Sequence, residues 1–168
     1  DLCEIGLSGN IEEKMNFVKE KVGKEISVSD IFEKNKLVDL RGLTKGHGLS
    51  GPVKRFGITL KQHKSEKGIR RPGSLGPWHP ARVTFRAPMA GQHGMFTRIV
   101  YNNKIIDIGK SDGNEKLKNI KNFGNVKTDY IILNGSVQGP AKRQILLTFP
   151  LRETKKQLKK NYELIEIR

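Results

Sequence analysis

Four histidines are the residues of this chain whose side chains most readily suggest a metal or catalytic site. They are His47, His63, His79 and His93. They lie 14 to 16 positions apart with no cysteine nearby, whereas zinc sites need ligands paired at short spacing. Acid–base catalysis needs a histidine oriented by a carboxylate, yet Glu66 is the only acid between Leu40 and Ile106. The pattern favours four separate histidines, each either contacting RNA or packing at the surface.

A glycine motif in the same stretch has the spacing of a dinucleotide-binding turn. Gly46-His-Gly-Leu-Ser-Gly51 matches G-x-G-x-x-G. Such a site needs a following helix to hold the pyrophosphate, and an acid about 20 residues on to bind the ribose. We expect Pro52 and Gly57 to break any helix, and the acidic position falls among Arg70, Arg71 and Pro72. We therefore interpret the glycines as places where the backbone approaches a phosphate chain closely.

Uncompensated positive charge is the strongest signal in the chain. From Leu40 to Ile106 there are 13 lysines or arginines and one acid, so this stretch carries +12 of the net +15. Exposed charged faces normally mix signs, and this one does not. Ten of the 18 glycines and five of the seven prolines fall here, which excludes a long helix. Irregular cation spacing argues against a recognition helix in a DNA groove and favours RNA recognised by shape and phosphate.

Trp78, the only tryptophan, lies in Leu75-Gly-Pro-Trp-His-Pro80. A lone tryptophan is ordinarily a core residue. Here the flanking prolines stiffen the chain, and no apolar pattern surrounds the ring. A rigid turn that presents an aromatic face is typical of base stacking.

The bulk composition limits the classes of protein. A length of 168 residues suits one domain, with or without an extension. The pI of about 10.0 favours an anionic partner, which on charge alone includes RNA, DNA and an anionic membrane surface. No apolar run approaches the ~18 residues of a membrane span, and the single Cys3 excludes an internal disulfide. The chain begins at Asp1 without a methionine, so we expect a fragment.

The elements that position these residues are predicted to be mainly strands. Apolar spacing predicts a helix over 11–22, with Asn10 as its N-cap, and a helical turn over 30–35. Strands are predicted over 36–43, 98–101, 104–108, 126–133 and 144–149, with a turn at Asn102-Asn103 between the second and third. Residues 152–160 are predicted to form either a basic helix or a solvated tail. Residues 163–167 are predicted to form a last edge strand.

Three motifs in register resemble the large-subunit ribosomal protein L3 family, in its archaeal and eukaryotic branch. They are Thr44-Lys-Gly-His-Gly48, Gly73-Ser-Leu-Gly-Pro-Trp-His-Pro-Ala-Arg-Val83 and Met89-Ala-Gly-Gln-His-Gly94. The resemblance continues through Lys104-Ile-Ile-Asp-Ile-Gly109, Asn134-Gly135 and Gly139-Pro140. Members of this branch are roughly twice as long, which implies that the barrel is incomplete here.

The resemblance implies a six-stranded β-barrel of the translation-protein type, with an extension threading through rRNA toward the peptidyl-transferase centre. It places Trp78 at the tip of the extension and makes Gln92 similar to a glutamine that is methylated in bacterial members. Glu66 stands where eukaryotic members have a histidine, so no modification is transferred to that site.

We therefore predict a mainly β fold with minor α: a helical surface segment over 1–35, a barrel body over 36–43 and 97–168, and a basic rRNA-penetrating extension over 44–96. The predicted function is a structural constituent of the large subunit in the cytoplasmic ribosome, without a cofactor, small-molecule substrate or membrane contact. Its predicted partners are rRNA and neighbouring ribosomal proteins. The rival class is an RNA-modifying or nucleotide-dependent enzyme. The predicted rRNA-binding residues are Arg41, Lys45, His47, Lys54, Arg55, Lys61, His63, Lys64, Lys67, Arg70, Arg71, Trp78, His79, Arg82, Arg86, Gln92, His93 and Arg98.

Overall fold

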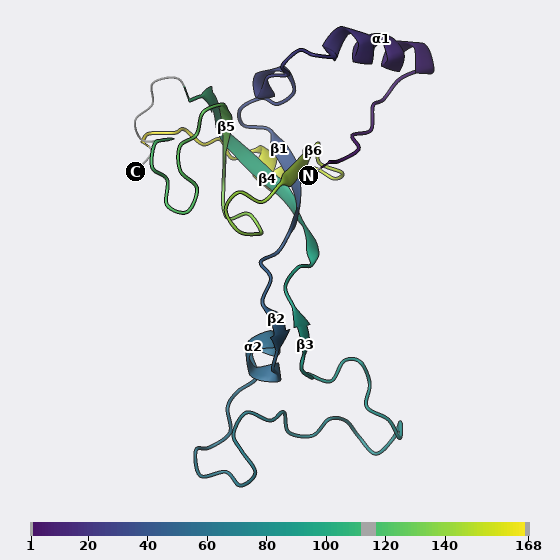
Figure 1. Cartoon of the computed structure of the whole chain (residues 1–168), viewed down its shortest axis with the longest axis vertical. Coiled ribbons are helices and arrows are strands. Elements are labelled where there is room, and N and C mark those ends of the chain that lie inside the picture. Colours follow the sequence, from purple (N-terminus) through teal and green to yellow (C-terminus); the bar gives the residue numbers. More distant parts are fainter. Residues whose placement is uncertain (1, 112–116, 167–168) are drawn as a thin grey trace. The chain divides into compact units, whose positions relative to one another are not determined.

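The structure, a computed structural model, describes residues 2–111 and 117–166. The chain forms two compact units (Figure 1). The sheet unit comprises Asp1–Gly42 and Ile99–Arg168, and the basic unit comprises Leu43–Arg98. Each unit has its own sheet and is described separately below.

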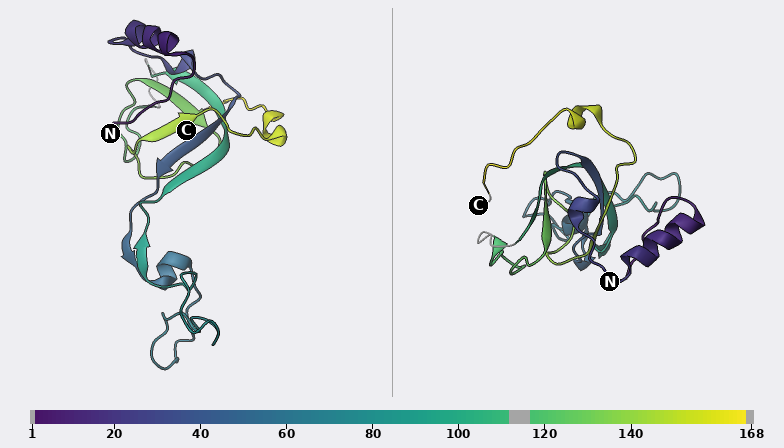
Figure 2. Two further views of the ribbon diagram at one scale, coloured as in Figure 1. Left: turned by 90° about the vertical axis from the view of Figure 1, so that its right-hand side faces the viewer. Right: turned by 90° about the horizontal axis from the view of Figure 1, so that it is seen from above.

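Four strands make the sheet of the first unit, in the order β5-β4-β1-β6. They are β1 (Leu37–Leu43), β4 (Thr97–Lys110), β5 (Asp129–Leu133) and β6 (Ile145–Thr148). β1 pairs antiparallel with β6, and β4 pairs antiparallel with β5. The sheet curls into a half-barrel (Figure 2). The fold is thus mainly β, as predicted, but the described residues supply four of the six expected strands and close no barrel.

Burial of both faces of β1 organises the small core of the sheet unit. Val38 and Leu40 lie on one face, fully buried with Ile105 of β4. Around them pack half-buried apolar side chains, among them Ile131 of β5 and Leu147 of β6. Strand alternation places Leu37 and Asp39 on the other face, and both are also buried.

The buried Asp39 carboxylate is satisfied by backbone donors. Its Oδ1 accepts a hydrogen bond from the Asn102 N–H at 2.8 Å, and its Oδ2 accepts one from the Leu151 N–H at 3.1 Å. Asn102 itself has a left-handed backbone, with φ of 56°. The predicted turn at Asn102-Asn103 is therefore wrong. Asn102 has the left-handed conformation that asparagine tolerates in turns, but it lies inside the continuous strand β4, and its N–H donates to the Asp39 carboxylate.

The helices differ from the predictions mainly at their ends. α1 (Ile11–Lys21) forms as expected, and the Glu13 carboxylate accepts a hydrogen bond from the Asn10 N–H at 3.0 Å. The second turn is a 3₁₀ helix, η1 (Val28–Asp30), which starts earlier than predicted. Of the basic segment 152–160, only α3 (Lys155–Leu158) is helical. Residues 163–166 form no strand, and Ile167 lies outside the described residues.

The basic unit contains a short ladder and a one-turn helix. β2 (Gly48–Ser50) pairs antiparallel with β3 (Gly91–His93), and α2 (Pro52–Phe56) follows β2 directly. The expectation that Pro52 would prevent a helix is wrong, because proline is tolerated in the first turn, where its missing N–H has no partner anyway. Gly57 then ends the helix with φ of 67°.

Candidate nucleic-acid interface

The ladder of the basic unit brings together the two limbs of the chain that flank it. Gly48, Leu49 and Ser50 are in register with His93, Gln92 and Gly91, respectively. The His47 N–H donates to the His93 carbonyl at 2.9 Å, and the Thr44 N–H donates to the Phe96 carbonyl at 3.0 Å. The Thr44 hydroxyl oxygen accepts from the Phe96 N–H at 3.1 Å. Residues 44–50 and 91–96 thus form one hydrogen-bonded base for the segment between them.

Gly94 is required at this base. Its φ is +81°, and a Cβ added there would lie 1.8 Å from the Lys45 carbonyl oxygen. No side chain can occupy that space without separating the limbs. Gly94 and Ser50 are also the two buried residues of the basic unit.

Arg55 fastens α2 to the returning limb. Its Nε donates to the Gln92 carbonyl at 3.0 Å, and its Nη1 donates to the Met89 carbonyl at 2.9 Å. The guanidinium also lies over the Phe56 ring, 4.9 Å from its centroid. Sequence reasoning treated this residue only as one cation among many. Its architectural role depends on contacts between positions 34 and 37 residues apart, which the local sequence does not reveal.

His47 and His93 face each other across the ladder. Their ring centroids are 4.8 Å apart, with the planes tilted by 35°. His93 is half-buried, and its Nδ1 is buried with no hydrogen-bond partner in the described structure. His63 and His79 are exposed and belong to the irregular segment between α2 and β3. The four histidines are thus not equivalent.

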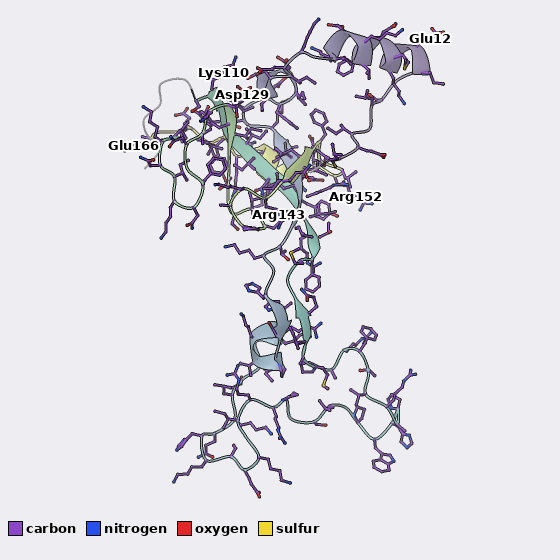
Figure 3. All side chains as sticks on the ribbon, in the orientation of Figure 1. Glu12, Lys110, Asp129, Arg143, Arg152 and Glu166 are labelled. Atoms are coloured by element: carbon purple, nitrogen blue, oxygen red, sulfur yellow. The ribbon has the colours of Figure 1, made fainter. Side chains whose placement is uncertain are left out.

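Most of the predicted binding residues are exposed. In Figure 3 the side chains between α2 and β3 extend away from the ribbon. The half-buried exceptions are Arg41 of β1, which lies in the sheet unit, together with Arg55 and His93. The exposed members are Lys45, His47, Lys54, Lys61, His63, Lys64, Lys67, Arg70, Arg71, Trp78, His79, Arg82, Arg86, Gln92 and Arg98.

The basic unit lacks a hydrophobic core. All of its residues, Leu43–Arg98, are described, and no apolar side chain among them is buried. Trp78 is 88% exposed and Phe85 is 93% exposed. The core interpretation of Trp78 is therefore excluded. The unit holds eleven lysines or arginines against one acid, Glu66, so neither apolar burial nor charge pairing accounts for its conformation.

Three concavities gather subsets of the predicted residues. One of about 530 Å³ is lined by Lys45, His47, Arg55, His93 and Arg98, with Phe56 and Phe96. A second, of about 370 Å³, includes Arg70 and Arg71. A third, of about 410 Å³, includes Trp78 and Arg82. Other predicted residues, among them Lys61, Lys64 and Arg86, line none of these three.

Sequence reasoning missed one basic loop of the sheet unit. Lys142 and Arg143 line a concavity of about 730 Å³ with Phe123, Val137 and neighbouring loop residues. Lys142 has a left-handed backbone, with φ of 67°, just after Gly139-Pro140. The signal that could have found this loop is the pair of cations directly after a Gly-Pro turn.

No metal-binding cluster accompanies these cations in the described structure. Among the residues it describes, no group of three or more His, Cys, Asp or Glu could hold a metal ion. Within the Gly46–Gly51 motif, residues 48–50 form strand β2 and Gly51 is the N-cap of the five-residue helix α2, which is too short for the helix of a dinucleotide-binding unit. Among the described helices, none is long and apolar enough to cross a membrane.

A unit with eleven lysines or arginines against one acid is typical of nucleic-acid-binding proteins. Residues 1–167 match the family described as Ribosomal protein L3. The chain belongs to the ribosomal protein L3 family.

Three archaeal relatives carry the name Large ribosomal subunit protein uL3. The protein of Methanocaldococcus jannaschii is 41% identical over 156 residues, covering 90% of this chain and 47% of the relative. The Archaeoglobus fulgidus protein is 40% identical over 158 residues, covering 92% and 48%. The Picrophilus torridus protein is 41% identical over 160 residues, again covering 92% and 48%. The chain therefore spans about half the length of these relatives.

Family membership confirms the resemblance found in the three motifs. The family is one of ribosomal proteins and not of enzymes, as predicted. Family membership therefore does not support the rival interpretation as an RNA-modifying or nucleotide-dependent enzyme.

Proposed function

We propose that the chain is an rRNA-binding structural constituent of the large ribosomal subunit in the cytoplasmic ribosome. The observation that carries this proposal is the basic unit: eleven cations, one acid and no buried apolar side chain. Such a unit repels itself and gains little from folding alone. A polyanion that neutralises the cations supplies the missing stabilisation.

The mechanism is charge neutralisation. The exposed cations replace diffuse counterions around the rRNA phosphates, while glycines allow the backbone to approach closely. In this proposal residues 44–96 are the extension that enters the rRNA, and the 18 predicted residues contact it. Residues 36–43 and 97–168 belong to the barrel body, 1–35 form a surface segment, and neighbouring ribosomal proteins complete the surroundings.

We place Trp78 toward the peptidyl-transferase centre. The support is its 88% exposure and the concavity of about 410 Å³ that it lines with Arg82 and Val83. An exposed indole between two prolines is suited to stack on an unpaired base.

Salt dependence tests the function directly. If the chain neutralises Z phosphates of a large-subunit rRNA fragment, the slope of log affinity against log salt is about −0.7Z to −0.9Z. Replacing Lys61, Lys64 and Lys67 by glutamine should make the slope shallower by about 2 to 3, because three phosphate contacts are removed. Fluorescence anisotropy across a salt series measures it.

The matched control is the same triple change on α1, at Lys14, Lys19 and Lys21, which lie outside the basic unit. We expect that variant to keep the wild-type slope. A flat salt dependence of the wild-type chain, or an equal loss in both triple variants, would contradict the proposal.

A further inference from the structure

The concavity lined by Lys45, His47, Arg55, His93 and Arg98, here called the base pocket, differs from the irregular segment because the β2–β3 ladder and the Arg55 hydrogen bonds hold part of its lining in place. Arg55 belongs to α2, His93 to β3 and Arg98 to the start of β4, while Lys45 and His47 lie on the limb that leads into β2. The His47 N–H donates to the His93 carbonyl, so two lining residues are tied together, and Arg55 donates to two backbone carbonyls. The pocket is thus preformed.

The chemistry of its lining is that of an anion site. Three permanent cations and two imidazoles converge there, and no carboxylate is among the lining residues. Two nitrogens of the Arg55 guanidinium are used in holding the backbone, which leaves Nη2 as a donor. The His93 Nδ1 is buried without a hydrogen-bond partner in the described structure, so one of the lining residues carries an unsatisfied polar group.

Two aromatic rings complete the walls and restrict the kind of anion. Phe56 lies beneath the Arg55 guanidinium at 4.9 Å, and Phe96 lies beneath that of Arg98 at 5.1 Å. A volume of about 530 Å³ is larger than a lone phosphate needs. Cations backed by aromatic faces suit a phosphodiester with its sugar, since the phosphate pairs with the cations and the sugar covers the rings.

We infer that the base pocket binds one phosphodiester of RNA as a preformed anchor, around which the irregular segment between α2 and β3 becomes ordered. This inference rests on the proposed function and adds a defined subsite to it. The cations between residues 58 and 88 then bind afterwards, each at lower cost once the anchor is occupied.

The four histidines provide an internal comparison for the test. The full chain, isotopically labelled at histidine, is titrated with inorganic phosphate at fixed pH, while sodium chloride holds the ionic strength constant. We expect saturable NMR shifts of the His47 and His93 imidazoles and only small, non-saturating shifts of His63 and His79. Lys45→Gln should weaken phosphate binding about tenfold, the loss of one charge-assisted hydrogen bond. Lys14→Gln, the same change on α1 outside the basic unit, should leave it unchanged.

A second titration, with a large-subunit rRNA fragment, separates this inference from the proposed function. The anchor is refuted if phosphate shifts the NMR signals of all four histidines alike and Lys45→Gln weakens RNA binding no more than Lys61→Gln. The proposed function still stands in that case if the RNA binds with a steep salt dependence. If phosphate binds selectively but the RNA does not bind, the RNA assignment fails together with the function. Selective shifts and a larger RNA defect in Lys45→Gln support the anchor.

Discussion

Trp78 and Leu40 show how differently single residues contribute to this protein. Trp78 is 88% exposed, whereas Leu40 is fully buried in the sheet. Trp78→Ala should leave the melting temperature nearly unchanged and remove a stacking contact of about 1–3 kcal/mol. Leu40→Ala should cost about 2–5 kcal/mol of unfolding free energy because it leaves a cavity. Thermal melts of the two variants, with RNA binding measured in parallel, check both values, and a large melting-temperature drop for Trp78→Ala would contradict its exposed position.

Asp129 links η1 to β5 and makes the sheet unit sensitive to acid. Its pKa is lowered from 3.8, first by the hydrogen bond from the Ser27 hydroxyl at 2.7 Å and next by that from the Val28 N–H at 3.1 Å. Partial desolvation opposes the shift, and Lys110, its partner in the β4–β5 register and labelled with it in Figure 3, lowers the pKa further.

Because the folded pKa lies below the unfolded one, the carboxylate contributes stability above about pH 4 that is lost as the pH falls through the folded pKa. Asp129→Asn should therefore lower stability at pH 6 and reduce the acid sensitivity of unfolding below pH 4. Asp30→Asn, which removes the same charge from η1, serves as control. Urea unfolding at pH 6 and pH 3 compares them, and an unchanged pH dependence in Asp129→Asn would rule out this link.

At the scale of elements, the β2–β3 ladder depends on one glycine. Gly94→Ala places a methyl group where the Lys45 carbonyl already lies and forces a residue with φ of +81°. We expect the ladder to lose at least the ~1–3 kcal/mol of stability typical of such backbone strain. The loss is measured as faster hydrogen exchange of the His47 amide, which donates across the ladder. Gly51→Ala is the matched control, since its φ is −71° and nothing lies within 4 Å of an added Cβ. Equal exchange in both variants would contradict the role of Gly94.

The segment between α2 and β3 should behave differently from the ladder in the free protein. Between residues 58 and 88 the backbone hydrogen bonds close short turns, apart from one donated by Lys61 to Ile69 at 3.0 Å. We expect amides of this segment to exchange rapidly without RNA, while those of Val38 and Leu40 in β1 are protected. Hydrogen-exchange mass spectrometry resolves the two regions. Strong protection across 58–88 without RNA would show an independently stable structure.

At the scale of the whole molecule, the sequence predicted what depends on local pattern or on bulk charge. Periodicity and turn residues predict the α1 helix and the central parts of β1, β5 and β6. Charge density predicts the exposure of the lysines and arginines between α2 and β3. The continuous strand β4 did not, because the backbone conformation of Asn102 is decided by Asp39, a residue far away in sequence. The base pocket could not be predicted either, since the His47–His93 contact and the Arg55 bonds join limbs separated by the whole irregular segment.

The position of the basic unit between two neighbouring strands has a consequence for how freely its length can change. The chain leaves the sheet unit at Gly42 and re-enters it at Ile99, and the two limbs are joined by the β2–β3 ladder. The entropy of closing a loop grows only with the logarithm of its length, so doubling the segment beyond the ladder costs about 0.6 kcal/mol. Insertions or deletions there hardly change the free energy of the sheet. The stability of the sheet unit therefore places little constraint on the length of that segment.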